Sequence, residues 1–305
     1  MSRVVVFCEV SAVADRVRSQ FPSLDVIDIS EGLPPDVQGE VLFGGFNPHS
    51  VEAMERGVRW VQLTGTGVDG VPRALLRAER VTCARGASAL AISEYVVATM
   101  GAFARGFPQN WLHEVPERWN FQRATTLAGA TVGLYGFGGI AQRVARIALA
   151  LEMTVVALRR TDTPSPIAGV EVLTDQSELF ARSDHLVLAA PATARTHHVI
   201  NAQTIRQLKP GVHLVNIARG SLVDQDALLV ALDAGTIARA SLDVSDPEPL
   251  PAGHWLFSHP QVFLTPHSSW AGPPFLQGAS DIFCDNLGRY LAGQPLQFEV
   301  GTEGY

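Results

Sequence analysis

Short apolar runs alternate with amphipathic stretches between about residues 128 and 268 of this chain. The apolar runs are rich in β-branched residues and predict buried strands, whereas segments such as Asp224–Asp233 have the helical period. This alternation indicates a parallel sheet covered by helices on both faces. The predicted strands are Thr131–Tyr135, Thr154–Leu158, Val170–Leu173, His185–Ala189, Val212–Ile217, Ala238–Val244 and Gln261–Leu264.

The first third of the chain predicts a second, smaller α/β unit. A polar helical segment, Ala12–Gln20, separates its first two apolar runs, and Ser93–Phe103 predicts a helix that leads into the larger unit. The last predicted helix, Phe275–Leu291, belongs to neither pattern, so we expect it to return and pack on the N-terminal unit. The predicted strands of this unit are Val4–Phe7, Val26–Ile29, Val41–Gly44, Trp60–Leu63 and Val81–Ala84.

These patterns divide the chain into two domains. Its 305 residues exceed one usual domain, and with 47% hydrophobic and 17% charged residues it can build two sizeable cores. The smaller domain is expected to comprise residues 1–92 and 271–305 and is therefore discontinuous in sequence. The larger domain is expected to span residues 93–270.

The first strand of the larger domain runs into the glycine-rich turn Gly136–Ala141, which a helical pattern and a second strand follow. In the context strand–G-x-G-x-x-A–helix–strand, such a turn predicts a dinucleotide site. Gly136 permits the tight turn, Gly138 lets the backbone approach a pyrophosphate, and Ala141 allows close helix–strand packing. The N–H groups of a helix that begins near Gly139 face the phosphates. The alternative is a glycine turn used only for packing.

The end of the second strand indicates which dinucleotide binds. An NAD site usually has an acidic residue there, which accepts hydrogen bonds from the adenosine ribose. Here Arg159 stands 23 residues after Gly136, and Arg160 and Thr161 follow it. A guanidinium fork can bind a 2′-phosphate, and a charge-assisted bond of this kind contributes about 1.5–3 kcal/mol. The sequence therefore favours NADP over NAD; the alternative is two solvated arginines with loose NAD binding.

Charge and cysteine usage narrow the classes of partner. The formal net charge of −7 argues against a nucleic-acid or anionic-membrane surface. Cys8, Cys83 and Cys284 are far apart and lack C-x-x-C spacing, which indicates buried thiols in a reduced, intracellular protein.

Targeting and membrane segments are not predicted. Glu9 interrupts the only early apolar run, unlike a signal peptide. The most apolar long window, residues 87–107, contains Glu94 and Arg105 and cannot readily span a bilayer. We expect a cytoplasmic protein.

Arg219, Glu248 and His267 each follow a different predicted strand of the larger domain. Ligands of an open parallel sheet bind beyond the carboxyl ends of its strands, so we expect these residues near the dinucleotide. The set suits reduction of a carbonyl by hydride. A histidine supplies the proton, a carboxylate favours its charged form, and an arginine holds and polarises the substrate. Taken singly, a surface turn arginine, a solvated glutamate and a structural histidine are the commoner explanations.

Together these motifs resemble the D-isomer-specific 2-hydroxyacid dehydrogenases, in the family's order and at its spacing. The resemblance extends from the loop Gly65–Asp69 to the last helix. It departs from the family at Ala141, a tolerated replacement of the third glycine, and at Trp270, where smaller residues are usual. The segments that carry it are Gly136–Ala141, Asn216–Gly220, Leu242–Val244, Asp246–Leu250 and Leu264–His267.

The resemblance implies a Rossmann-type doubly wound parallel sheet domain, which binds the dinucleotide, and a smaller flavodoxin-like α/β domain, which binds the substrate. It implies His267 as acid/base, Glu248 as its partner and Arg219 as the anchor of the substrate carboxylate and carbonyl. Asp243 would take the nicotinamide carboxamide. The arginine pair after the second strand is similar to the NADP-preferring glyoxylate/hydroxypyruvate reductase branch.

The implied binding residues are more numerous. The backbone of the loop after the fourth strand would hold the substrate carboxylate, and Trp270 either lines the substrate pocket or packs the hinge. The substrate set is Gly65, Thr66, Gly67 and Trp270. The cofactor set is Gly136, Phe137, Gly138, Gly139, Ile140, Arg159, Arg160, Thr161, Ala190, Pro191, Ile217, Ala218, Asp243 and Ser269.

We therefore expect an NAD(P)-dependent enzyme that reduces a small 2-oxo acid, such as glyoxylate, hydroxypyruvate or a bulkier one, to the D-2-hydroxy acid, in a cleft that closes around the substrate. In relatives the region around Trp111 and Trp119 contributes to a dimer contact, so a homodimer is expected; a solvated loop is the alternative. No metal is expected, because His197 and His198 have no carboxylate at metal-ligand spacing.

Two rival functions share this fold. One is a dinucleotide-sensing binding protein of the corepressor type, which the acidic charge and the short chain disfavour. The other is a formate or phosphite dehydrogenase. Glu248 paired with His267 favours the hydroxyacid branch over the formate branch, where an amide replaces the carboxylate.

Overall fold

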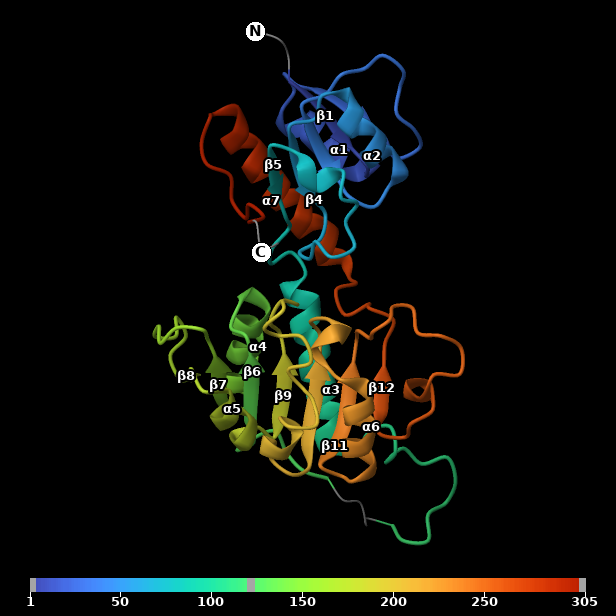
Figure 1. The fold of residues 1–305 in the computed structure, drawn as a ribbon, viewed down its shortest axis with the longest axis vertical. Coiled ribbons are helices and arrows are strands. Elements are labelled where there is room, and N and C mark those ends of the chain that lie inside the picture. Colours follow the sequence, from blue (N-terminus) through green and yellow to red (C-terminus); the bar gives the residue numbers. More distant parts are fainter. Residues whose placement is uncertain (1–3, 120–123, 302–305) are drawn as a thin grey trace. The chain divides into compact units, whose positions relative to one another are not determined.

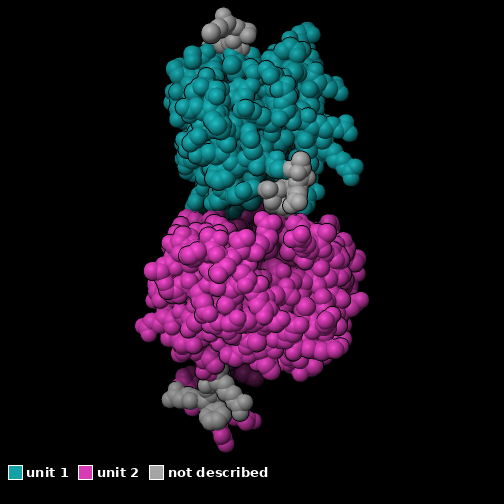
Figure 2. Space-filling view, turned by 60° about the vertical axis from the view of Figure 1, so that its left-hand side comes forward, with its two compact units in different colours: residues 1–88, 272–305 teal, residues 89–271 magenta. Residues whose placement is uncertain are grey.

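The computed structural model describes residues 4–119 and 124–301, which form two compact units. Unit 1 joins the residues up to 88 with those from 272 onward, and unit 2 comprises residues 89–271 (Figure 2). Unit 1 is therefore built from both ends of the chain.

Each boundary between the units lies at the start of a helix. α3 (Ala89–Arg105) begins directly after the first boundary, so the predicted division at 92/93 would cut a continuous helix. Its hydrogen bonds and packed face keep it in one unit. The second boundary, at 271/272 instead of the predicted 270/271, precedes α7 (Pro273–Leu291). Two prolines open α7, which the first helical turn tolerates because its N–H groups have no partner within the helix.

Unit 1 contains a five-stranded parallel sheet with the strand order β2-β1-β3-β4-β5. This order is that of flavodoxin-like folds, as the family resemblance implies. All five predicted strands are present; β3 and β4 have the predicted ends, and the ends of the other three are shifted by one or two residues. The strands are β1 (Val5–Cys8), β2 (Asp25–Asp28), β3 (Val41–Gly44), β4 (Trp60–Leu63) and β5 (Arg80–Thr82).

Helices cover both faces of this sheet. α1 (Ser11–Gln20) and α7 pack with β1, β3 and β4 in one apolar core, in which Phe283 of α7 contacts Phe43 and Trp60. α2 (Pro48–Ala53) borders the core on the other face. The expected return of the last helix to the N-terminal unit is confirmed, and Figure 1 shows α7 in red beside the blue strands.

Unit 2 contains a seven-stranded parallel sheet with the order β12-β11-β10-β9-β6-β7-β8. All seven predicted strands are present, and the predicted fold class, a doubly wound α/β sheet, is confirmed. The strands are β6 (Thr131–Tyr135), β7 (Thr154–Leu158), β8 (Val170–Leu173), β9 (His185–Leu188), β10 (Val212–Asn216), β11 (Ile237–Leu242) and β12 (Val262–Leu264).

An apolar core lies on each face of this sheet, whose strands and helices are drawn in Figure 1. On one face α3 packs with α4 (Gly139–Ala150) through residues such as Met100 and Val144. On the other face α5 (Gln176–Arg182) and α6 (Gln225–Asp233) contribute Phe180 and Leu228. Burial on both faces explains why the strands are almost continuously apolar.

The order of the strands places the functional edge. In sequence order, the first strand of this sheet is β6. β7 and β8 follow on one side of it, and β9 to β12 follow on the other side. The order thus reverses between β6 and β9, and ligands of such sheets bind beyond the carboxyl ends of the strands at that point.

No helix of the described part is long and apolar enough to cross a membrane. Cys8, Cys83 and Cys284 are free and buried, and burial raises the pKa of all three thiols.

Candidate active site

Each of three adjacent strands of unit 2 is followed by one of the predicted catalytic residues. Arg219 follows β10, Glu248 lies in the loop after β11, and His267 follows β12. Because β10, β11 and β12 are neighbours in a parallel sheet, all three loops leave the same edge. This is also the edge from which the glycine turn after β6 emerges.

His267 and Glu248 form a direct pair. The Nδ1 atom of His267 lies 2.9 Å from Oε2 of Glu248. The other carboxylate oxygen, Oε1, accepts a hydrogen bond of 3.1 Å from the backbone N–H of Ser245, which holds Glu248 within its own loop. An ionised carboxylate only accepts, so Nδ1 carries the proton in this pair. The pair therefore has the geometry of an imidazole oriented by a carboxylate.

Asp243 organises the turn that carries His267. Its side chain is buried, and Oδ1 accepts bonds from Oγ1 of Thr265 at 2.6 Å and from the Ser268 N–H at 2.9 Å. Oδ2 accepts from the Ser269 N–H at 3.0 Å, and the Asp243 carbonyl accepts from the His267 N–H at 2.8 Å. Three of the four acceptor positions of the carboxylate thus serve this turn. The predicted contact with a nicotinamide carboxamide would use the fourth.

The loop that carries Arg219 is closed by Asn216. The amide of Asn216 donates to the Arg219 carbonyl at 2.8 Å and accepts from the Ala218 N–H at 3.0 Å. Arg219 is half-buried, and its guanidinium donates to the Ala218 carbonyl at 2.7 Å. A positive charge is thus held at the end of β10, next to the loop of Glu248.

Gly220 links the loops of Arg219 and Glu248. A Cβ atom at this position would lie 2.0 Å from the carbonyl carbon of Ser245, so only glycine lets the two backbones approach. The sequence analysis assigns no role to Gly220 or Asn216. The only sequence feature that points to them is the Asn216–Gly220 segment, which is one of those that carry the family resemblance.

The glycine turn has the conformation that a dinucleotide site requires. Gly136 has a φ of 98°, and a Cβ there would lie 2.9 Å from the backbone nitrogen of Ala190. Gly138 is the N-cap of α4, and at both Gly138 and Gly139 a Cβ would meet nothing within 4 Å. The first N–H groups of α4 therefore border open space, which fits a diphosphate. Ala141 is buried in the core that α3 and α4 form with the strands of unit 2.

The arginine pair lies where the sequence predicts, directly after β7. Arg159 is half-buried, and one of its nitrogens donates to the carbonyls of Thr163 at 3.3 Å and Pro164 at 3.5 Å. Arg160 and Thr161 are exposed, and so is Asp162, whose carboxylate the sequence prediction did not weigh. The turn thus offers two guanidinium groups beside one carboxylate.

The other predicted cofactor residues also follow strands of this sheet. Ala190 and Pro191 come after β9, and Ile217 and Ala218 are buried directly after β10. Phe137 and Ile140 belong to the glycine turn and the first turn of α4, and Ser269 is buried beside Asp243.

Trp270 is partly exposed and contacts the turn that carries His267. Its indole N–H donates to the His267 carbonyl at 2.7 Å. The sequence left open whether this side chain lines a substrate pocket or packs a hinge, and this contact ties it to the turn of His267.

Within unit 1, the predicted substrate loop follows β4. The Gly65 carbonyl accepts from the Ala84 N–H at 2.8 Å, and the Thr66 hydroxyl donates to the Ala84 carbonyl at 3.2 Å. These bonds attach the loop to the segment after β5. Gly65, Thr66 and Gly67 are each partly exposed at the carboxyl edge of the sheet of unit 1.

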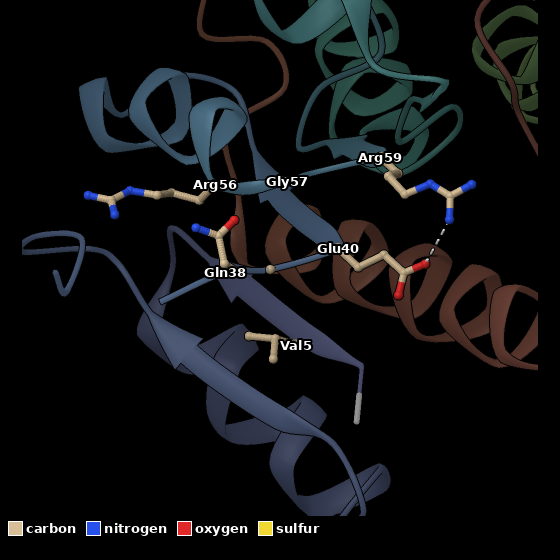
Figure 3. Close-up of a pocket in the computed structure, with 7 residues that line it drawn as sticks. Val5, Gln38, Glu40, Arg56, Gly57 and Arg59 are labelled. Carbon is tan, nitrogen blue, oxygen red and sulfur yellow. Dashed lines mark ion pairs between the residues drawn. The ribbon is translucent and has the colours of Figure 1, made fainter. Parts of the chain in front are cut away.

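A cavity of about 260 Å³ in unit 1 lies at the opposite edge of that sheet (Figure 3). Two of its lining residues, Glu40 and Arg59, directly precede β3 and β4 and thus mark the amino ends of the strands. Arg59 pairs with Glu79 at 2.9 Å, and Arg56, which Figure 3 shows pointing another way, pairs with Glu52 at 3.8 Å. Both arginines that line the cavity are thus paired with carboxylates, so the cavity does not resemble an anion site.

Metal chemistry has no evident ligand set in the described residues. Across 4–119 and 124–301, no group of three or more His, Cys, Asp and Glu side chains is arranged to hold a metal ion. His197 and His198 stack on each other, with ring centroids 3.9 Å apart.

Known proteins resemble this chain over most of its length. Residues 97–269 match the family model described as D-isomer specific 2-hydroxyacid dehydrogenase, NAD binding domain. The chain is 31% identical over 262 residues to hydroxypyruvate reductase of Thermotoga maritima, covering 83% of this chain and 80% of that protein. It is 30% identical over 250 residues to glycerate dehydrogenase of Methylorubrum extorquens, covering 78% and 77%.

A solved structure gives the same result. The D-isomer specific 2-hydroxyacid dehydrogenase of Xanthobacter autotrophicus, in complex with NADPH and MES, aligns with a TM-score of 0.85 at 26% identity. The alignment covers 100% of both chains. The similarity therefore includes both units, beyond the segment that the family model matches.

Proposed function

The chain belongs to the family of D-isomer-specific 2-hydroxyacid dehydrogenases, and on this premise we propose that it transfers a hydride from NADPH to a small 2-oxo acid to give the D-2-hydroxy acid. The proposed substrates are glyoxylate, hydroxypyruvate or a bulkier 2-oxo acid. The observation that carries the proposal is the 2.9 Å pair of His267 and Glu248 on the sheet edge that also bears Arg219 and the glycine turn.

His267 is the proposed acid. Reduction of a carbonyl leaves its oxygen in need of a proton, and a histidine is suited to provide one near neutral pH. With Nδ1 bonded to Glu248, Nε2 is the ring nitrogen that gives its proton to the substrate oxygen. The negative charge of Glu248 stabilises the protonated imidazole before this transfer.

Arg219 is the proposed anchor for the substrate. Its guanidinium matches the two oxygens of a carboxylate, and a positive charge beside the carbonyl stabilises the negative charge that develops on the oxygen. The Asn216 amide holds the backbone on both sides of Ala218 and so fixes the start of the Arg219 side chain.

The cofactor is proposed to lie along the glycine turn, with its diphosphate at the N-terminus of α4. When bound, the nicotinamide supplies the hydride. Arg159, Arg160 and Thr161 are proposed to bind the 2′-phosphate that distinguishes NADPH from NADH. The position of the pair directly after β7 and the likeness to a structure that contains NADPH support this preference.

The test is a panel of 2-oxo acids assayed with NADPH and with NADH. Glycolate, the product of glyoxylate, is achiral, so chiral chromatography is applied to the products of the other acids. We expect these products to be the D-isomers, and His267→Gln should lower kcat by about 10²–10⁴-fold. His197→Gln is the matched control, because His197 is an exposed histidine of the same unit. Absence of reduction with every acid and both cofactors would refute the proposal, as would full activity of His267→Gln.

A homodimer is part of the proposal. The segment after α3 exposes Trp111, Leu112, Val115 and Trp119, an apolar group unusual for a solvated loop. Buried Arg239 anchors the segment by bonds of 3.1 Å to the Phe107 carbonyl and 2.9 Å to the Gln109 side chain. Sedimentation of Trp111→Glu and Val115→Glu should show monomers where the parent chain is a dimer. A monomeric parent chain would refute this part of the proposal.

A further inference from the structure

A line of polar groups connects helix α3 with the turn that carries His267. The Tyr95 hydroxyl lies 3.0 Å from Oγ1 of Thr265, and the same Oγ1 lies 2.6 Å from Oδ1 of Asp243. Tyr95 is on α3, whereas Thr265 and Asp243 follow β12 and β11. All three belong to unit 2, so the line lies within one compact body.

The direction of these hydrogen bonds follows from their end point. An ionised Asp243 carboxylate has no proton, so Thr265 donates to it. The Thr265 hydroxyl has one proton, and its oxygen therefore accepts the second bond, from the Tyr95 hydroxyl. Burial raises the pKa of the Tyr95 phenol, so Tyr95 keeps the proton that it donates. Each donor is thus oriented toward the buried negative charge.

The backbone of His267 needs such support. Its φ of 49° lies in the left-handed region, which costs a residue with a side chain about 1 kcal/mol or more. The backbone carbonyl of Asp243 accepts from the His267 N–H, and its carboxylate accepts from the N–H groups of Ser268 and Ser269. If the carboxylate moves, its bonds to Ser268 and Ser269 change together, and the turn that carries the imidazole moves relative to Glu248.

We propose that Tyr95 and Thr265 are positioning residues, which fix the carboxylate of Asp243 and through it the imidazole of His267. This inference rests on the proposed function, because it takes His267 as the acid. Neither residue is assigned a contact with substrate or cofactor. Their effect on turnover comes from the geometry of the His267 turn.

The first test compares Thr265→Val, Thr265→Ser and Tyr95→Phe. Valine has nearly the shape of threonine without its hydroxyl, so Thr265→Val should lower kcat about 10- to 100-fold, a larger change than that in the KM of the 2-oxo acid. Thr265→Ser should restore most of the activity. Tyr95→Phe removes a bond between neutral groups and should lower kcat about 2- to 10-fold. Tyr290→Phe, which removes a hydroxyl bonded to Glu40 in unit 1, is the matched control and should leave kcat unchanged.

The second test asks whether the two hydroxyls act in series. If they do, Tyr95→Phe should have almost no further effect in a chain that already has Thr265→Val, because the link to Asp243 is missing. Fully multiplied effects of the two substitutions would show independent actions and overturn the proposal. A loss confined to KM, with kcat unchanged, would also overturn it.

A third measurement needs no turnover. The ring resonances of His267, identified by their loss in His267→Gln, should shift in the NMR spectrum of Thr265→Val and return in Thr265→Ser. Unmoved resonances in Thr265→Val would refute the positioning role even if no 2-oxo acid is reduced. Conversely, shifted resonances in a chain without reductase activity would refute the proposed reaction and leave the positioning role supported.

Discussion

Nδ1 of His267 and Oε2 of Glu248 lie 2.9 Å apart, and each side chain keeps about two fifths of its surface accessible, 42% and 40%. An ion pair that served only stability would contribute little at this exposure, since water weakens the attraction between its two charges. An acid that must contact its substrate, in contrast, needs an accessible side chain. The partial exposure of this pair is what leads us to expect function from it.

Glu248→Gln should separate the charge of this residue from its hydrogen bond. The amide oxygen can still accept from Nδ1, but the negative charge that stabilises the protonated imidazole is lost. We expect kcat/KM for a 2-oxo acid to fall about 10- to 100-fold. Steady-state kinetics of the variant and the parent measure this. Glu178→Gln, at an exposed carboxylate of α5, is the control, and an unchanged kcat/KM for Glu248→Gln would contradict the role.

Arg159→Asp should change the coenzyme preference. A carboxylate directly after β7 repels a 2′-phosphate and accepts from ribose hydroxyls, so the ratio of kcat/KM for NADPH over NADH should fall by about 10- to 150-fold. Arg206→Asp introduces the same charge at an exposed position elsewhere in unit 2. If both variants keep the parent ratio, Arg159 does not recognise the phosphate.

Two buried histidines should make unit 2 sensitive to acid. Nδ1 of His185 lies 3.1 Å from Nδ1 of His213, whose Nε2 lies 2.9 Å from the Ser241 hydroxyl. Burial lowers the pKa of His185 to about 4, although nearby Asp184 opposes the shift. Burial also lowers the pKa of His213, and His185 and then Arg239 lower it further.

The sign of the effect follows from these pKa values. A histidine that is neutral when buried and protonated when unfolded gives full stability above about pH 6.5 and loses it as the pH falls toward 4. For His185 alone the loss approaches roughly 3 kcal/mol. Urea unfolding at pH 7.5 and pH 5 should show this loss of stability, and His185→Asn and His213→Asn should each make the loss smaller. His197→Gln, at an exposed ring, should leave the loss unchanged. Equal pH dependence in all variants would show that the buried histidines do not cause it.

Gly220→Ala should displace the loop of Glu248. The added Cβ would lie 2.0 Å from the carbonyl carbon and 2.1 Å from the carbonyl oxygen of Ser245. Both atoms belong to the backbone and cannot rotate away as a side chain could. We expect a loss of about 1–3 kcal/mol of stability, the usual cost of overpacking, together with a lower kcat. Gly288→Ala in α7, where a Cβ would meet nothing within 4 Å, should leave both quantities near the parent values. A fully active and stable Gly220→Ala would show that the two loops can separate freely.

The strands could be predicted because apolar runs between turns are a local signal. Their ends were less certain: β10 ends at Asn216, one residue before the predicted Ile217, because the ladder stops where Asn216 bonds to its own loop. The positions of Arg219, Glu248 and His267 followed from the same signal, since each comes after a strand.

Contacts between distant residues could not be predicted in this way. Tyr95 and Thr265 are 170 positions apart and meet because α3 packs against the sheet of unit 2. The pair of His185 and His213 depends on β9 and β10 being neighbours in register. The approach of Gly220 to Ser245 depends on two loop conformations. Each is decided by tertiary packing, which hydrophobic periodicity does not encode.

At position 267 the backbone would rest at lower energy with glycine or asparagine, the residues that tolerate a φ of 49°. Replacement by either should therefore yield a chain that resists heat better and turns over about 10²–10⁴-fold more slowly. A search for thermostable variants, if it scored melting temperature alone, would select against the histidine on which turnover depends.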